Sequence, residues 1–143
     1  MQITFNNQDV SNIFDSYPSH IKQKLLVVRK LIYDVAQNNQ QEVGAIEETL
    51  KWGEPSYVTT QTKSGSTIRL GWRKSHPTEY AIYFNCHTTL VDTFKIKYGN
   101  LFTYGGNRSI IFSEDTNVPI AELSDCILIA LTYHSRKANR IIF

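Results

Sequence analysis

A carboxylate and two aromatic side chains within ten residues of chain could form a small recognition site. They are Glu48, Trp52 and Tyr57, and Gly53 and Pro55 lie between the aromatic residues. Glu48 and Trp52 are four residues apart, so they share one face if this segment is helical. Gly53 would then end the helix and Pro55 would keep it from resuming, which sends Tyr57 away in an extended direction. We therefore expect Glu48, Trp52 and Tyr57 to converge at one corner, either as a ligand site or as a packed junction.

Three residues on later strands could complete this site. Alternation along the expected strands places Arg69, Tyr83 and Asn85 on the sheet face opposite the apolar residues. The Arg69 guanidinium could pair with Glu48 or bind an external anion, and a structural ion pair is the more common outcome. The predicted ligand site therefore consists of Glu48, Trp52, Tyr57, Arg69, Tyr83 and Asn85.

Other reactive residues give little support for catalysis or for a metal centre. The histidines are dispersed, and no pair has the spacing of a helical or strand metal site. Cys86, His134 and Asp92 could form a nucleophilic set, although nothing in the sequence requires it. We predict no catalytic residue and no metal ligand, and we expect His134 to be a buried histidine on the last helix.

Composition is typical of one ordinary domain. The chain has 143 residues, of which 41% are hydrophobic, which is enough for a single core. Fifteen basic and thirteen acidic residues leave a formal charge of +2, too small to indicate a nucleic-acid or membrane partner through bulk electrostatics. Any basic surface must therefore be local. No signal-peptide pattern and no membrane-spanning apolar run is visible, so we expect a cytoplasmic protein without nucleic-acid or membrane partners.

The elements that position these residues are two long amphipathic helices and several short strands. Apolar residues recur every three or four positions from 18 to 37 and again from 119 to about 137, which predicts a first and a last helix. Shorter helices are expected over 42–51 and 90–98, and strands over 57–62, 67–72, 79–85, 101–104 and 108–112. This order predicts an α+β fold, with an antiparallel sheet of about five strands and helices packed on one face. We expect the first and last helices to lie side by side.

Four segments together resemble the YdhG-like family of bacterial domains of unknown function. They read ETLKWGEPSY from Glu48, YFNCHTTLVDTF from Tyr83, GNRSIIF from Gly106 and ALTYH from Ala130. The resemblance covers about residues 15–137 of a single domain spanning 1–143. It implies a compact α+β sandwich similar to frataxin, and one branch of the family has been assigned an intracellular iron-chaperone role.

The iron role implied by this resemblance can be compared with the residues of the first helix. A frataxin-like iron surface is an acidic ridge on that helix, because hard cations need several carboxylate oxygens close together. Here the helix carries four basic residues, Lys22, Lys24, Arg29 and Lys30, against one acid, Asp34. We therefore predict no cofactor and expect any iron binding to be weak and without a defined site.

The sequence favours a non-enzymatic domain that binds a small ligand or a protein. One alternative is a frataxin-like intracellular iron chaperone. A second is an interaction module that forms homodimers or larger homo-oligomers. This second alternative depends on Leu26 and Tyr33, which form a stripe on the first helix about 120° from its main apolar face.

Overall fold

A computed structural model of the protein describes residues 3–137. Its helices are α1 (Gln8–Ser16), α2 (Ser19–Asn38), α3 (Gln40–Val43), α4 (Leu90–Tyr98) and α5 (Ile120–Leu131), with a short 3-10 helix, η1 (Gly99–Leu101). Its strands are β1 (Glu47–Lys51), β2 (Glu54–Val58), β3 (Ile68–Gly71), β4 (Glu79–Tyr83), β5 (Thr103–Gly105) and β6 (Ser109–Ser113). None of the described helices is long and apolar enough to cross a membrane.

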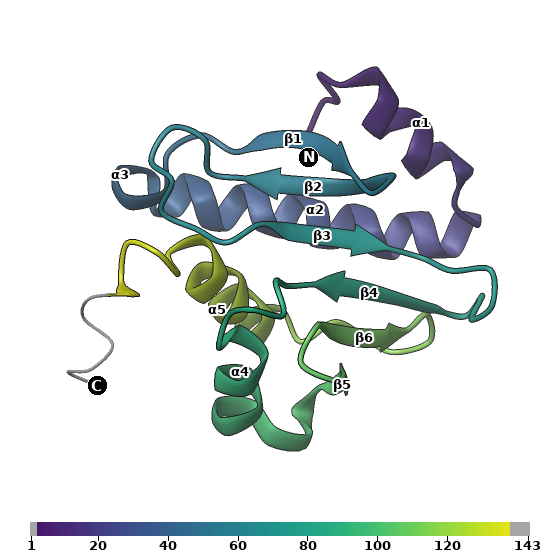
Figure 1. Ribbon diagram of the computed structural model, residues 1–143. Coiled ribbons are helices and arrows are strands. Elements are labelled where there is room, and N and C mark those ends of the chain that lie inside the picture. Colours follow the sequence, from purple (N-terminus) through teal and green to yellow (C-terminus); the bar gives the residue numbers. More distant parts are fainter. Residues whose placement is uncertain (1–2, 138–143) are drawn as a thin grey trace.

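The strands form one antiparallel sheet in the order β1-β2-β3-β4-β6-β5. Helices α2 and α5 contact each other and cover one face of this sheet, and none of the described helices covers the opposite face (Figure 1). The predicted α+β class and the antiparallel pairing are confirmed. The two long predicted helices, which correspond to α2 and α5, lie side by side as expected. The sheet has six strands where about five were expected.

The helix expected over 42–51 is wrong. Only the short α3 forms, and the chain then enters β1, which pairs with β2 from Glu47 opposite Val58 to Lys51 opposite Glu54. Trp52 and Gly53 make the two-residue connection, with φ angles of 56° and 74°. Positive φ at both positions is what a type I′ hairpin turn requires. The pairing of β1 with β2 therefore outweighs the local helical pattern.

Two further differences concern the helices. Helix α1 has no counterpart among the predicted helices, and its Val10 and Phe14 are fully buried. Helix α5 ends at Leu131 instead of near 137, so His134 lies beyond the helix and is exposed, not buried as expected.

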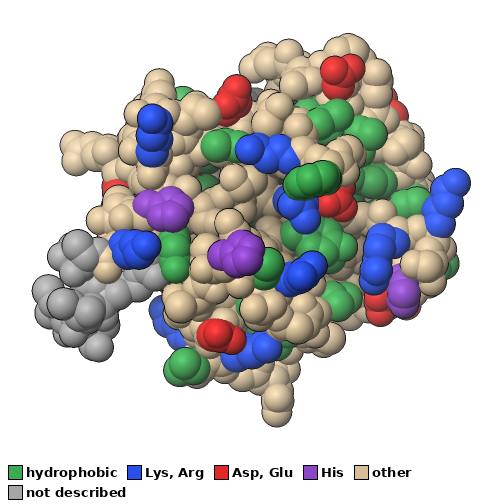
Figure 2. Space-filling model, viewed as in Figure 1, with side chains coloured by type: hydrophobic (Ala, Val, Ile, Leu, Met, Phe, Trp, Pro, Cys, Tyr) green, Lys and Arg blue, Asp and Glu red, His purple; other side chains and the backbone are tan. Residues whose placement is uncertain are grey.

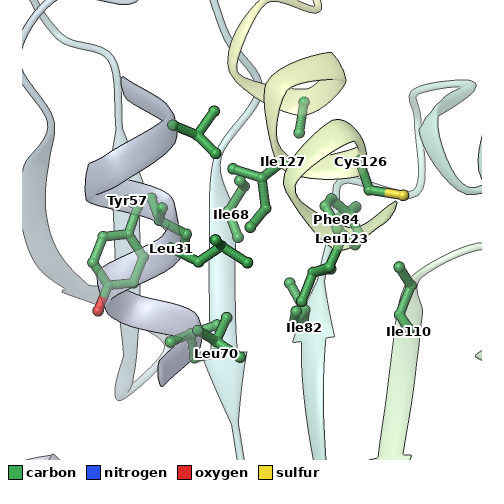
Figure 3. Packing of buried hydrophobic residues seen from close by; sticks show 14 of the residues in the cluster. Leu31, Tyr57, Ile68, Leu70, Ile82, Phe84, Ile110, Leu123, Cys126 and Ile127 are labelled. Atoms are coloured by element: carbon green, nitrogen blue, oxygen red, sulfur yellow. The ribbon is translucent and has the colours of Figure 1, made fainter. Parts of the chain in front are cut away.

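The core lies between the helical layer and one face of the sheet. Three isoleucines point to that face and are fully buried: Ile68 of β3, Ile82 of β4 and Ile110 of β6. Leu123 and Ile127 of α5 pack over them (Figure 3). Because strand side chains alternate between faces, the neighbours of these isoleucines within each strand, such as Arg69, Ala81 and Ile111, point to the uncovered face.

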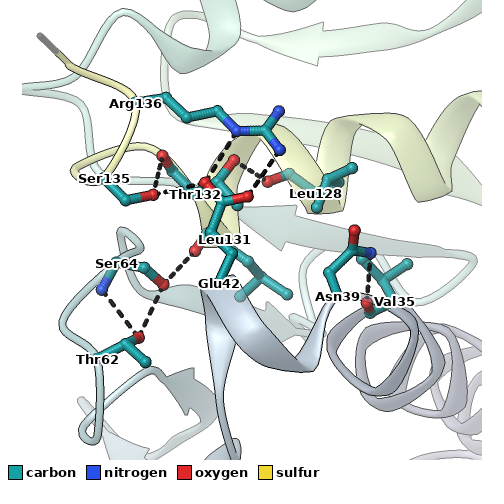
Figure 4. Close-up of polar contacts among 10 residues, drawn as sticks. All are labelled: Val35, Asn39, Glu42, Thr62, Ser64, Leu128, Leu131, Thr132, Ser135 and Arg136. Atoms are coloured by element: carbon teal, nitrogen blue, oxygen red, sulfur yellow. Dashed lines mark hydrogen bonds and ion pairs between the residues drawn. The ribbon is translucent and has the colours of Figure 1, made fainter. Parts of the chain in front are cut away.

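The loop between β2 and β3 closes the C-terminal end of α5. Ser64 Oγ donates to the carbonyl of Leu131 at 2.7 Å (Figure 4), and the Ser66 N–H donates to the carbonyl of Ala130 at 2.9 Å. These bonds satisfy carbonyls that the end of a helix leaves without partners. Gly65 makes the approach possible, because a Cβ there would lie 2.6 Å from the Leu131 carbonyl oxygen.

Gly65→Ala should therefore lower the free energy of unfolding by about 1–3 kcal/mol, because the new methyl group would push the loop off the helix end. Urea denaturation measures this loss. Gly106→Asn is the matched control, since nothing lies within 4 Å of a Cβ at Gly106 and asparagine tolerates its positive φ of 60°. Equal losses in the two variants would contradict this account of the loop.

Candidate functional site

The structure divides the predicted site residues between the two faces of the sheet. Glu48 and Tyr57 lie directly opposite each other in the β1–β2 ladder and both point to the helix-covered side. The other four line one hollow on the uncovered face: Trp52, Arg69, Tyr83 and Asn85. The predicted convergence of Glu48, Trp52 and Tyr57 at one corner is therefore wrong, because Trp52 belongs to a hairpin turn and not to a helix that contains Glu48.

Glu48 and Tyr57 belong to a buried ion-pair cluster. The Glu48 carboxylate accepts bonds from Arg29 Nε at 2.6 Å, from Arg29 Nη2 at 2.9 Å and from the Tyr57 hydroxyl at 2.8 Å. The side chains of Arg29 and Glu48 are only 3% and 6% exposed. Burial raises the pKa of Tyr57 well above its ordinary value, and the neighbouring Glu48 charge raises it further. Their enclosure makes Glu48 and Tyr57 structural residues.

Arg29 also forms hydrogen bonds with the backbone of the segment that precedes α1. Its Nη1 donates to the carbonyl of Ile3 at 2.6 Å and its Nη2 to the carbonyl of Thr4 at 3.2 Å. The guanidinium lies 3.8 Å from the centre of the Phe5 ring. Burial is the largest single influence on the pKa of Arg29 and lowers it, but the hydrogen bond to Glu48 and the charges of Glu48, Tyr57 and Tyr33 together raise that pKa above its ordinary value. The sequence-based expectation that Glu48 pairs with Arg69 is wrong, since Arg29 occupies that carboxylate.

Glu48→Ala should lower the free energy of unfolding by about 3–5 kcal/mol, because it leaves the Arg29 charge buried without its acceptor. Tyr57→Phe removes one buried hydrogen bond and should cost about 1–2 kcal/mol. Chemical denaturation measures both. Arg69→Ala is the control and should cost about 1 kcal/mol or less, since its side chain is 32% exposed. A loss in Arg69→Ala as large as that in Glu48→Ala would restore the pairing expected from sequence.

The uncovered face of the sheet, called the open face below, carries a hollow of about 510 Å³. Figure 2 shows Lys and Arg side chains beside hydrophobic ones on this face, over the strands. The lining residues are Lys51, Trp52, Thr67, Arg69, Tyr83, Phe84, Asn85, Cys86, His87 and Arg108. Three of them are basic and none is a carboxylate. The hollow is therefore suited to negative charge.

Cross-strand pairing positions Arg69 in this hollow. Arg69 lies opposite Tyr83 in the ladder, and its guanidinium lies 5.3 Å from the centre of the Tyr83 ring. Its Nε donates to Glu54 at 2.8 Å. A Cβ on Gly71 would collide with the Glu54 carboxylate and lie 2.7 Å from the Tyr83 ring, so glycine leaves room for both. Burial raises the pKa of Glu54, although Arg69 acts in the opposite direction.

Trp52 is exposed in a conformation that tryptophan rarely adopts. Trp52 is 89% exposed, so the alternative of a packed junction with Glu48 and Tyr57 is wrong. Its positive φ suits asparagine or glycine, and such a backbone costs a larger residue free energy. Nothing in the core needs the indole ring. Strain and exposure in one residue indicate a role in binding.

Lys51 and Arg108 line the hollow but were not predicted as site residues, and neither was Glu54, which is outside the lining and pairs with Arg69. Lys51 and Glu54 flank the Trp52–Gly53 turn, and reading this segment as a hairpin would have found them. Arg108 is the last residue of the turn before β6 and has no comparable signal in the sequence. Within residues 3–137, no three His, Cys, Asp or Glu side chains gather in a group that could hold a metal ion.

No protein-family model, curated protein or solved structure matches this chain significantly. The resemblance to the YdhG-like family and the iron-chaperone role that it implies therefore stay predictions. The open face is the candidate functional site on its geometry alone.

Trp52→Asn should raise the free energy of unfolding by about 1 kcal/mol, because asparagine adopts the left-handed backbone with less strain. Thermal and urea denaturation of the variant and the unmodified protein measure the difference. A loss of stability of similar size would mean that Trp52 has a structural role.

Proposed function

We propose that the protein is a non-enzymatic binding domain whose open face receives an anionic ligand. The observation that carries this proposal is the strained, exposed Trp52 beside a hollow lined by three basic residues and no carboxylate. A protein selected for stability alone would have little reason to keep tryptophan at this turn. A cytoplasmic location is part of the proposal.

The positive charge of the hollow is largely uncompensated. Among the described residues, Lys51 and Arg108 are exposed and form no ion pair. Arg69 uses its Nε for Glu54, which holds its guanidinium plane against the Tyr83 ring. A ligand carboxylate or phosphate would gain charge-assisted hydrogen bonds from these groups without breaking a strong existing pair.

The experiment is a calorimetric titration with four anions of different size: citrate, thymidine monophosphate, polyphosphate and a single-stranded oligodeoxynucleotide. At least one of them should bind, and Lys51→Ala and Arg108→Ala should each weaken that binding severalfold. Both residues are exposed, so these variants should fold normally.

Lys24→Ala is the matched control, because it removes one positive charge from α2 on the helix-covered side. Binding that persists in Lys24→Ala and weakens in the open-face variants supports the proposal. Failure of all four anions to bind, or equal weakening in all three variants, would refute it.

A further inference from the structure

A second hollow continues the first along the open face. It has a volume of about 310 Å³, and Tyr83 and Arg108 line both hollows. Arg73 and His76 lie in the second hollow, beyond the end of β3. The two hollows together form a trough with Tyr83 and Arg108 at its middle.

Positive charge is distributed along this trough instead of converging at one point. The charged residues that line the two hollows are four basic ones, Lys51, Arg69, Arg73 and Arg108, and one acidic one, Glu79. A compact anion is held best by cations that converge on it, whereas spaced cations suit a chain that carries a charge on each unit. The small formal charge of the whole protein conceals this local excess.

Ring systems lie among these cations. Trp52 and His87 line the first hollow, His76 lines the second, and Tyr83 lies between them. Bases of a single strand stack on such rings without sequence preference, while basic residues hold the phosphates. The exposed indole of Trp52 is the most accessible of these surfaces, at 89% exposure.

Small side chains keep the floor of the trough low. Gly71, Ala81 and Ile111 are consecutive neighbours across β3, β4 and β6, and Tyr83, Ser109 and Gly105 are neighbours in the adjacent row. Four of these six residues are glycine, alanine or serine, so an extended chain could cross the sheet close to its backbone. The same small residues would add little to the binding of a compact ligand.

We infer that the ligand of the open face is a single strand of nucleic acid that crosses β3 and β4, with bases stacked on Trp52 and Tyr83 and phosphates held by Lys51, Arg69, Arg73 and Arg108. This inference rests on the proposed function and names its ligand. The Glu54 carboxylate stays with Arg69, and Glu79 limits the strand at the far side of the second hollow.

The test is fluorescence anisotropy with a labelled oligo-deoxythymidylate of about 12 nucleotides, at about 50 mM salt and at higher salt. Trp52→Asn should weaken binding about tenfold through loss of stacking. Arg108→Ala should weaken it severalfold and lower the slope of log affinity against log salt by about 0.7. Lys24→Ala should leave both affinity and slope unchanged.

Competition separates the two proposals. Thymidine monophosphate and citrate should displace the oligonucleotide only at concentrations at least about a hundredfold higher, and a duplex of equal length should compete poorly. If citrate or the mononucleotide binds as tightly as the oligonucleotide, the nucleic-acid inference is wrong and the proposed function stands. If no anion binds, or if only Lys24→Ala weakens binding, both are wrong.

Discussion

The buried ion pair between Arg29 and Glu48 fixes which way the β1–β2 hairpin faces. A shift of one residue in the β1 register would turn the Glu48 carboxylate to the open face and leave Arg29 buried without an acceptor. Leaving such a charge unpaired costs about 3–5 kcal/mol, a large part of the stability of an ordinary domain. Because Arg29 also binds the carbonyls of Ile3 and Thr4, the same side chain joins the N-terminal segment, α2 and the edge strand.

The composition of the open face follows from this orientation. With Glu48 directed inward, Lys51 lies on the opposite side of β1, and its ladder partner Glu54 lies beside it. Glu54 can then accept a hydrogen bond from Arg69, because Gly71 has no side chain to occupy the space that the Glu54 carboxylate fills. Arg69 therefore pairs with Glu54 on the open face and does not pair with Glu48 on the helix-covered side. An inward acid thus leaves the outer face with an excess of basic groups.

The sequence predicted the elements whose periodicity is strong and missed those that depend on distant partners. Helices α2 and α4 and the central strands were found because their apolar residues repeat clearly. Segment 47–51 contains good helix formers, and only its pairing with β2 makes it a strand. Gly53 misled the prediction because a helix end and a type I′ turn both require positive φ. Strand alternation correctly placed three of the six predicted site residues, Arg69, Tyr83 and Asn85, in one hollow, whereas Trp52 reaches it through a turn that was not predicted. The burial of Arg29 had no local signal in the sequence.

A double-mutant cycle is the measurement that tests most directly whether Arg29 holds Glu48 on the helix side. The cycle uses Arg29→Met and Glu48→Gln, and a parallel cycle uses Arg69→Met and Glu48→Gln, with unfolding free energies measured in urea. The structure predicts a coupling of about 2 kcal/mol or more between Arg29 and Glu48, and a coupling within about 0.5 kcal/mol of zero between Arg69 and Glu48. A strong coupling to Arg69 and none to Arg29 would contradict the account, because Glu48 would then lie on the open face.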